Sequence, residues 1–503
     1  MSAPPRAVPR SAIVLLAVAA FALRAFHLNA QNLWYDEIGS VQVIATPVSR
    51  LASDFEAGRL EPTAWLSMAY WALTKAVAWP GLGDRDAVLR LTSAALGAAT
   101  IPALAWATAP ILPPGAVVAA AAALALSSFH VWYSQEVRPY VLLILLVTLA
   151  VGAWVRALGG GGGSRWAAAA ALVVLALYTH PIALALPMIL GIHLLSRARA
   201  DPRRARSGLA ALTVAGLAFV PALLLIRAHG ANNPADSRGV GWLDLPYVVY
   251  AYAVGFSYGP STGELHDDRL RAVMDSLPEV ALAAVIFGAL ILRGLAATRR
   301  LDASTRTLLL TWLALPLGLA FTVAATGANP LNARYGIVSF PAFVILIGLG
   351  AADVRRPAVA GLALGAAILS LVSRAQLAFD TRYAKEDCRG LAAALRAEAA
   401  PDDLVIVNAP YMAGAVRYYY PGPATVAAYP PTDAERDVDP TRAATDLRAL
   451  AAGRAHVWLV ATRSFHGDRA GTLPLVLGRE RTVDRTIELP GIVATRYASP
   501  AAR

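Results

Sequence analysis

The stretch SAIVLLAVAAFALRAFHLNAQNLWYDE, residues 11–37, decides the class of fold. Residues 11–28 form an apolar run that matches the length of a membrane-spanning helix, since roughly 20 helical residues cross the hydrocarbon core of a bilayer. Asp36 and Glu37 follow a few residues later, at the edge of such a bilayer. A carboxylate at membrane depth costs about 2.5–3.5 kcal/mol on insertion scales, so it is rarely there without a function. The pair is therefore the first candidate for a functional site.

Composition assigns the chain to the membrane class. Hydrophobic residues make up 57% of its 503 residues and charged residues 15%, whereas soluble domains contain about 25% charged residues. The net charge of +11 does not indicate nucleic acid, because the arginines fall between apolar runs and form no single basic patch. Cys388 is the only cysteine, which excludes an internal disulfide and a cysteine metal site.

Eleven apolar segments are predicted to be transmembrane helices. They lie at about 11–28, 88–109, 115–133, 138–156, 166–179, 181–196, 207–228, 277–293, 306–326, 334–352 and 357–375. The first follows Arg6 and Arg10 and so also fits a cleaved signal peptide. The stretch before Gln31 lacks a small-x-small cleavage site, however, which favours a retained helix.

The arginines between these segments predict the topology. With a cytoplasmic N-terminus, one set of loops holds nearly all of the clustered arginines, namely Arg156, Arg165, Arg197, Arg199, Arg203, Arg204, Arg206, Arg293, Arg299, Arg300, Arg306, Arg355 and Arg356. This alternation follows the positive-inside rule. A twelfth crossing at 61–79 would invert every later loop, so that segment is expected to lie along the outer surface or to re-enter. We therefore expect a multi-pass protein of the cell (plasma) membrane with a C-terminal domain outside the cytoplasm.

Two domains are predicted. Residues 1–375 form a polytopic α-helical transmembrane domain with outer loops at 29–87 and 229–276. Residues 376–503 shift to Asp, Arg, Pro and Tyr, and short apolar runs beginning at Leu404, His456 and Ile492 alternate with helical stretches. That pattern predicts a small extracytoplasmic α/β domain.

The unusual polar residues all fall on the predicted outer side. They are Asp36, Glu37, Glu61, Glu136, Arg138, Tyr140, His180, Arg334 and Tyr335. Each has a structural explanation when taken alone. The Asp36-Glu37 pair suits a helix N-terminus, Glu136 and Arg138 suit a surface ion pair, and an arginine at a helix end can reach the interface. Their occurrence together on one face favours an active site or a substrate pathway.

Four motifs in order resemble the polytopic GT-C glycosyltransferases, in particular the family 39 type. They are Trp34-Tyr35-Asp36-Glu37 after a first helix, Ser134-Gln135-Glu136-Val137-Arg138-Pro139-Tyr140, Tyr178-Thr179-His180, and Ala333-Arg334-Tyr335. This family type includes protein O-mannosyltransferases and the transferases that add aminoarabinose to lipid A. The resemblance covers residues 11 to about 375, and the predicted α/β domain has only a loose counterpart.

The resemblance implies an inverting transfer of a monosaccharide from a polyprenyl-phosphate donor to an acceptor hydroxyl on the outer face. It gives Asp36 the role of general base, with Glu37 orienting the acceptor or the Asp36 region. Arg138 and Arg334 would bind the donor phosphate, as guanidinium gives planar bidentate contacts. Glu136 would hold Arg138, and the remaining residues, His180, Tyr140 and Tyr335, would contact the sugar or the phosphate.

One position departs from the family pattern. Many relatives have Lys-Pro or His-Pro-Pro where this chain has Glu61-Pro62-Thr63. A cation at that position would help to hold the phosphate, so either Arg59, Arg138 or Arg334 replaces it or the donor is bound in a different way. A third carboxylate near Asp36 and Glu136 also suits a divalent cation, but we expect neither a metal nor another cofactor.

Other functions are compatible with the same features. A transporter or flippase of a lipid-linked saccharide would have as many spans, but its charges should lie near the bilayer midplane in broken helices. An oligosaccharyltransferase or polymer ligase would need a larger acceptor domain, and a scaffold role has little support. The expected partners are the lipid-linked donor, an acceptor lipid, glycan or protein, and membrane lipids, with no nucleic acid. The sequence leaves open whether the α/β domain selects the acceptor or only caps the lipid cleft.

Overall fold

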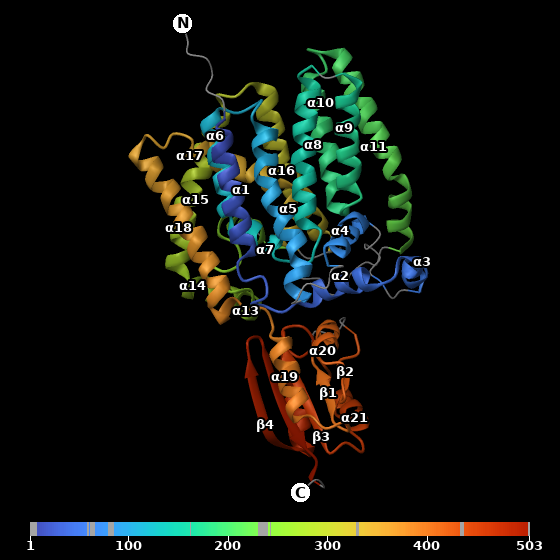
Figure 1. The fold of residues 1–503 in the computed structure, drawn as a ribbon. Coiled ribbons are helices and arrows are strands. Elements are labelled where there is room, and N and C mark those ends of the chain that lie inside the picture. The colour runs from blue at the N-terminus through green and yellow to red at the C-terminus, as the bar shows by residue number, and fades with distance from the viewer. Residues whose placement is uncertain are drawn as a thin grey trace. The chain divides into compact units, whose positions relative to one another are not determined.

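The computed structural model describes residues 8–57, 60, 66–78, 85–160, 162–229, 240–241, 243–327, 331–432 and 437–500. The chain forms two compact units, coloured along the sequence in Figure 1. Unit 1 consists of Met1–Leu28, Ser40–Gly259 and Ser276–Gln376, and unit 2 of Asn29–Gly39, Pro260–Asp275 and Leu377–Arg503.

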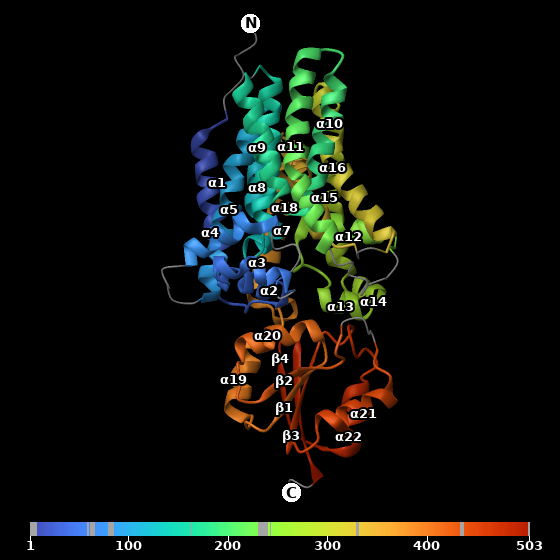
Figure 2. The ribbon, with the colours of Figure 1, turned by 90° about the vertical axis from the view of Figure 1, so that its right-hand side faces the viewer.

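Unit 1 is a bundle of helices, several of which run side by side in two views (Figures 1 and 2). The longer helices are α1 (Arg10–Ala25), α5 (Arg85–Thr108), α6 (Pro114–Leu126), α8 (Tyr140–Leu158), α9 (Gly163–Leu177), α10 (Ala185–Arg197), α11 (Pro202–His229), α15 (Leu277–Thr298), α16 (Ala303–Ala325), α17 (Phe340–Ala351) and α18 (Pro357–Phe379). The shorter elements are α3 (Val48–Glu56), α4 (Met68–Ala78), α7 (Ser128–Ser134), α12 (Asp244–Val254), and the 3-10 helices η2 (Pro181–Leu184) and η4 (Ala333–Ser339). Helix α2 (Tyr35–Ala45) crosses the boundary between the units at residue 39.

Each of the eleven predicted spans coincides with a helix or a consecutive pair of helices. Among the described residues, seven helices are long and apolar enough to cross a membrane, or eight if α6 and α7 form one span bent by 55°. The helices α1 and α9 and the pair η2–α10 are apolar but shorter. The chain thus has the apolar helices of a membrane protein, while eleven crossings and their orientation stay predictions.

Glycine allows two helices of unit 1 to pack backbone against backbone. A Cβ built on Gly294 of α15 would lie 2.2 Å from the Leu346 carbonyl oxygen of α17, and a Cβ on Gly350 of α17 would lie 2.1 Å from the Leu290 oxygen of α15. Close contact of this kind is how small residues hold membrane helices together, because the hydrophobic effect gives no drive for association within lipid.

A buried arginine fills the break between α6 and α7. Arg24 of α1 is fully buried, and its guanidinium donates to the carbonyl oxygens of Leu124 and Ala125, both at 3.1 Å, where α6 ends. It also contacts two groups of α7, the Ser134 hydroxyl at 3.2 Å and His130 Nδ1 at 2.7 Å. The carbonyls at a helix end have no partner within the helix. Arg24 supplies those partners and so fixes the bend that leads into the Ser134–Tyr140 motif.

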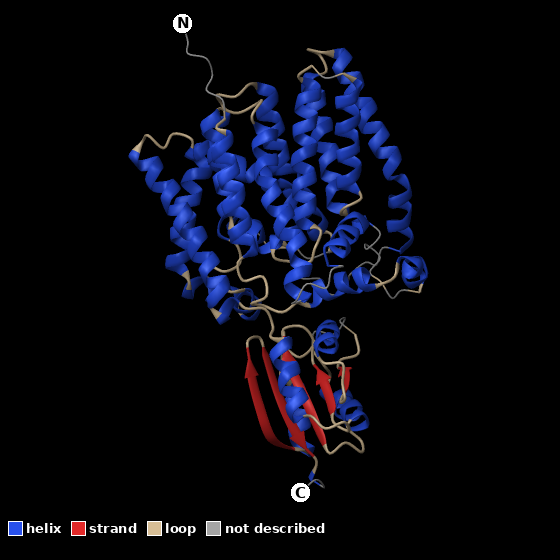
Figure 3. Cartoon of the chain, viewed as in Figure 1, coloured by secondary structure: helices blue, strands red, loops and turns tan. Residues whose placement is uncertain are grey.

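Unit 2 contains one five-stranded sheet, shown in red in Figure 3. Its strands are β1 (Leu404–Val407), β2 (Thr425–Ala428), β3 (His456–Thr462), β4 (Thr482–Leu489) and β5 (Ile492–Ala498), in the order β2-β1-β3-β5-β4. Strand β1 pairs in parallel with β2 and β3, and β5 pairs antiparallel with β3 and β4. The buried pairs of the parallel part, such as Val405 opposite Trp458, form the centre of the unit.

Helices complete the α/β arrangement of unit 2. They are α19 (Cys388–Glu398), α20 (Ala413–Tyr419), α21 (Pro440–Leu450) and α22 (Thr472–Glu480), with η5 (Thr381–Tyr383) and η6 (Pro410–Met412), and the earlier segment 260–275 adds α13 (Thr262–Asp267) and α14 (Arg269–Asp275). The predicted fold class, a polytopic helical protein with a small C-terminal α/β domain, is confirmed. Two segments from earlier in the chain, Asn29–Gly39 and Pro260–Asp275, belong to the same compact unit, which the sequence pattern did not predict.

Candidate functional site

The predicted pair Asp36 and Glu37 lies in the first turn of α2, and both side chains are buried. The amide nitrogen of Glu37 donates to the Trp34 carbonyl oxygen at 2.9 Å, and the Trp34 amide donates back to Glu37 Oε2 at 3.2 Å. Backbone N–H groups at the start of a helix have no partner within the helix. A carboxylate on the third residue of the helix can accept a hydrogen bond from the amide of the residue that precedes the helix, as in a capping box. Glu37 therefore fixes the turn on which Asp36 is carried.

Glu37 also has a cationic partner in unit 2. Lys385 Nζ lies 3.1 Å from Glu37 Oε2, and the two side chains are 9% and 0% exposed. The same ammonium lies 5.3 Å from the centre of the Trp34 ring. A buried carboxylate is tolerated when it is paired and hydrogen-bonded, and Glu37 is both.

A second cation lies over the aromatic side chains of the motif. The Arg463 guanidinium is 5.6 Å from the Trp34 ring centre and 5.5 Å from that of Tyr35, and Arg463 forms an ion pair with Glu386. Burial acts to lower the pKa of Arg463, but the negative charge of Glu386 outweighs it and the pKa is raised. Arg463 thus stays charged, and Tyr411 extends the cluster with its ring 4.7 Å from that of Tyr35.

The second group of predicted residues lies in unit 1, around the Ser134–Tyr140 motif. Glu136 is 1% exposed, and its carbonyl oxygen accepts from the Ser93 hydroxyl of α5 at 2.6 Å. Tyr70 of α4 contacts the same hydroxyl at 2.6 Å. Two other helices therefore hold the backbone of the motif in place.

Arg138 and His180 are neighbours of Tyr140. The Arg138 guanidinium carbon is 5.7 Å from the Tyr140 ring centre, and the Tyr140 and His180 rings are 5.4 Å apart. Arg138 also donates to the Ser40 hydroxyl of α2 at 3.4 Å. His180 accepts the Ile182 amide on Nδ1, a bond that favours the neutral ring.

Arg334 contributes positive charge to the same group. Burial first, and then the charges of Arg138 and Arg334, lower the pKa of His180 to about 3. Arg334 is the second residue of η4, and its backbone amide donates to the side-chain oxygen of the N-cap residue Asn332 at 3.0 Å. The Arg334 guanidinium carbon is 5.4 Å from the ring centre of Tyr335. Two arginines near a neutral imidazole make a positively charged region that suits a phosphate.

The structure therefore groups the predicted residues in two sets. Asp36 and Glu37 belong to unit 2, whereas Glu136, Arg138, Tyr140, His180, Arg334 and Tyr335 belong to unit 1. Helix α2 carries the two carboxylates in its first turn and Ser40, the acceptor from Arg138, in the next. Glu61 and Arg59 lie outside the described residues. Within the described ranges, no group of three or more His, Cys, Asp or Glu side chains is arranged to hold a metal ion.

No known protein family and no curated protein matches the chain by sequence. Solved structures do match it along nearly its whole length. ArnT from Cupriavidus metallidurans, bound to undecaprenyl phosphate, is 13% identical with a TM-score of 0.56, covering 96% of this chain and 97% of that chain. The AglB oligosaccharyltransferase from Archaeoglobus fulgidus, in complex with an inhibitory peptide and a dolichol-phosphate, is 12% identical with a TM-score of 0.56, covering 97% and 74%. The arabinofuranosyltransferase AftD from Mycobacteria is 16% identical with a TM-score of 0.50, covering 98% and 40%.

The chain has the GT-C glycosyltransferase fold. The resemblance inferred from the four motifs is thereby confirmed at the level of fold. At 12–16% identity the likeness establishes the GT-C architecture.

Three residues of this chain escaped the sequence analysis. Lys385 and Arg463 are separated from the Trp34–Glu37 motif by several hundred residues, so no local pattern connects them. Arg24 could have been noticed, because it is a lone arginine inside the first apolar run, where an ionisable residue is costly.

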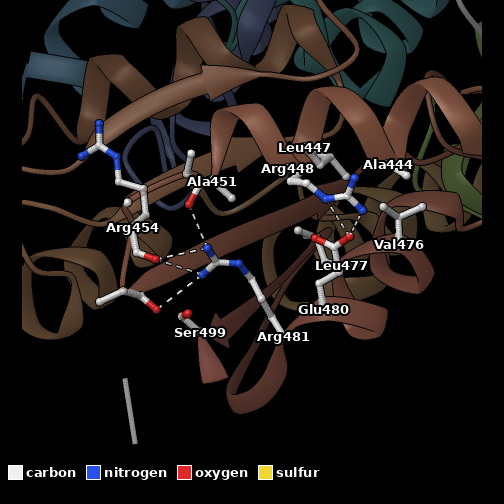
Figure 4. Close-up of a pocket in the computed structure, with 13 residues that line it drawn as sticks. Ala444, Leu447, Arg448, Ala451, Arg454, Val476, Leu477, Glu480, Arg481 and Ser499 are labelled. Carbon is white, nitrogen blue, oxygen red and sulfur yellow. Dashed lines mark hydrogen bonds and ion pairs between the residues drawn. The ribbon is translucent and has the colours of Figure 1, made fainter. Parts of the chain in front are cut away.

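A shallow pocket in the α/β part of unit 2 has a volume of about 500 Å³ (Figure 4). It lies between α21 and α22 and includes Arg448, Glu480 and Arg481. Arg481 donates to the carbonyl oxygens of Ala451 and Arg454, and Arg448 pairs with Glu480 at 3.0 Å. These charges are engaged in holding the domain together, and none of the predicted site residues lines the pocket.

Proposed function

We propose that the protein is an inverting glycosyltransferase that moves a monosaccharide from a polyprenyl-phosphate donor to an acceptor hydroxyl on the outer face of the membrane. The observation that carries the proposal is the buried Asp36 in the first turn of α2, in a chain with the fold of ArnT and AglB. The structures of those two proteins hold undecaprenyl phosphate and a dolichol-phosphate respectively. A donor of that lipid class is therefore the first candidate here.

Asp36 is proposed as the general base. It takes the proton of the acceptor hydroxyl while the acceptor oxygen forms a bond to the anomeric carbon, and the bond from that carbon to the phosphate oxygen breaks. The polyprenyl phosphate leaves with the electron pair. General-base catalysis contributes about 10²–10⁴-fold.

Arg138 and Arg334 are proposed to bind the phosphate. Its negative charge grows as the bond to the sugar breaks, and fixed cations stabilise a transition state in which charge develops. The neutral His180 is proposed to donate a hydrogen bond to the lipid-linked sugar. Tyr140 and Tyr335 are proposed to line the region that binds the sugar and its phosphate. Glu136 remains the proposed partner of Arg138, and Glu61 a candidate contact to the donor. The two arginines would supply the charge neutralisation that a divalent cation provides elsewhere, so transfer should persist in a chelator.

The deciding experiment is purification with native lipid, followed by mass spectrometry of bound lipid-linked sugars and a transfer assay with each species found. The expected result is a co-purified polyprenyl-phosphate monosaccharide that is consumed when extracts containing lipid, glycan or protein acceptors are added. Donors translocated between leaflets of a vesicle without loss of the sugar would instead indicate a flippase and overturn the proposal.

A further inference from the structure

The Trp34–Glu37 motif is held by the C-terminal α/β domain. Residues 29–37 have side-chain-mediated hydrogen bonds to several positions between 377 and 419. These join Asn29 to Arg389, Gln31 to Leu377 and to Lys385, Leu33 to the Tyr419 hydroxyl at 2.7 Å, and Glu37 to Lys385. The motif follows the first apolar helix in the sequence, yet it belongs to the compact unit built around the sheet.

Lys385 contacts the residue that follows Asp36 in the sequence. The Glu37 carboxylate joins the Trp34 amide and the Lys385 ammonium, at 3.2 and 3.1 Å, on the same oxygen. Because Glu37 and Asp36 are consecutive in one helical turn, the orientation of that turn sets the direction of the Asp36 carboxylate. Loss of the ammonium would leave a fully buried carboxylate without its charge partner, a strongly destabilising change.

Arg463 supports the same turn by contacting Trp34 and Tyr35, the other two residues of the motif. It follows β3 and has a φ of 45°, a backbone conformation that is costly for a long side chain. Its guanidinium lies over both Trp34 and Tyr35 and is oriented by Glu386. A strained residue persists where the surrounding structure requires it, and here it places the guanidinium over the two rings.

We propose that the α/β domain is the platform that positions the catalytic base, with Lys385 and Arg463 as positioning residues. The inference rests on the proposed function of Asp36, and it gives the domain a task different from acceptor selection or a passive cap. A base displaced by about 1 Å can lose about 10²-fold in rate. The domain would therefore control kcat even if it never touched the donor.

The test compares Lys385→Met, Lys385→Arg, Glu37→Gln and the Lys385→Met/Glu37→Gln double variant in the full-length protein. The matched control is Arg485→Met, which removes a half-exposed cation of the same domain that pairs with Glu398. Two quantities are measured. One is kcat and KM with the co-purified lipid-linked sugar, and the other is hydrogen exchange of the amides of residues 33–38, two of which bond to the Trp34 carbonyl.

We expect Lys385→Met to lower kcat by about 10²-fold with KM for the donor changed by less than about threefold. Exchange at 33–38 should become faster, and Lys385→Arg should recover part of both. In the Glu37→Gln background the further loss from Lys385→Met should shrink, because no buried carboxylate is then left unpaired. Arg485→Met should match the wild type.

Wild-type kcat and wild-type exchange in Lys385→Met would overturn the inference, as would an equal loss of kcat in both backgrounds. A wild-type protein that transfers no sugar would refute the proposed function instead. In that case the exchange measurement still decides whether Lys385 holds the motif.

Discussion

Lys385 Nζ and Glu37 Oε2 are 3.1 Å apart, and 348 residues of sequence separate them. The pair joins the segment after the first apolar helix to the segment that follows the last one. Both side chains are withdrawn from solvent, so the ion pair is kept by its geometry and by the additional hydrogen bond from Trp34. Glu37, which the sequence analysis expects to orient the Asp36 region, is thus engaged with protein partners, and Asp36 remains the proposed base.

Substitution of Asp36 by Asn is expected to lower kcat by about 10²–10⁴-fold, because an amide cannot take up the proton of the acceptor hydroxyl. Membrane insertion and the elution profile should not change. The control is Asp275→Asn, an exposed carboxylate at the end of α14. Turnover of the co-purified donor measures the effect, and an Asp36→Asn protein with full kcat would remove Asp36 from the mechanism.

Substitution of Arg138 or Arg334 by Gln is expected to weaken binding of polyprenyl phosphate by about tenfold or more, since a charge-assisted contact contributes about 1.5–3 kcal/mol. Native mass spectrometry with added undecaprenyl phosphate measures the bound fraction. Arg356→Gln, which removes an exposed arginine paired with Asp353, should bind like the wild type. Equal binding in all three variants would place the phosphate elsewhere.

Substitution of Arg24 by Met is expected to destabilise the protein by about 3 kcal/mol or more, because it leaves the buried carbonyls at the end of α6 without donors. Arg24→Lys should recover little, as one ammonium cannot reach acceptors on α6 and α7 together. Thermal unfolding in detergent measures the change. Arg10→Met, on the exposed start of the same helix, is the control and should leave the Tm unchanged.

The pH dependence of stability should contain a contribution from His180. Its pKa is about 3 in the folded protein and about 6.5 when unfolded, so the unfolded chain binds the extra proton first as the pH falls. The stabilisation is complete above about pH 6.5 and decreases toward pH 3, by about 2 kcal/mol between pH 6.5 and 5. The Tm of His180→Gln should therefore fall less over this range than that of the wild type or of the exposed-site control His27→Gln. Parallel curves for all three proteins would contradict this.

Substitution of Gly350 by Ala is expected to push α17 away from α15, because the new Cβ would lie 2.1 Å from the Leu290 carbonyl oxygen. Overpacking of this kind costs about 1–3 kcal/mol. Gly361→Ala in α18 is the control, since nothing lies within 4 Å of a Cβ there, and helix propensity favours Ala. Thermal unfolding measures the effect, and a Tm of Gly350→Ala equal to that of the wild type would contradict the predicted packing.

The sequence by itself determined the class of the protein. Membrane helices can be predicted from local hydrophobicity, because crossing the lipid requires about 20 consecutive apolar residues whose backbone groups are hydrogen-bonded within the segment. The strands near Leu404, His456 and Ile492 were equally local and are confirmed as β1, β3 and β5. The motif residues could be chosen for the same reason, since a charge beside an apolar run is conspicuous wherever it occurs.

Only the tertiary structure decided which residues support the motif. Lys385 and Arg463 belong to no motif that the sequence analysis identified, and their proposed role depends on contacts with residues several hundred positions away in the chain. No periodicity reports such contacts, because they follow from how the whole chain packs. The same holds for Arg24, whose guanidinium donates to a backbone carbonyl of a different helix. It holds also for Asn29–Gly39, which lies close to α1 in sequence but belongs to the compact unit that contains the sheet.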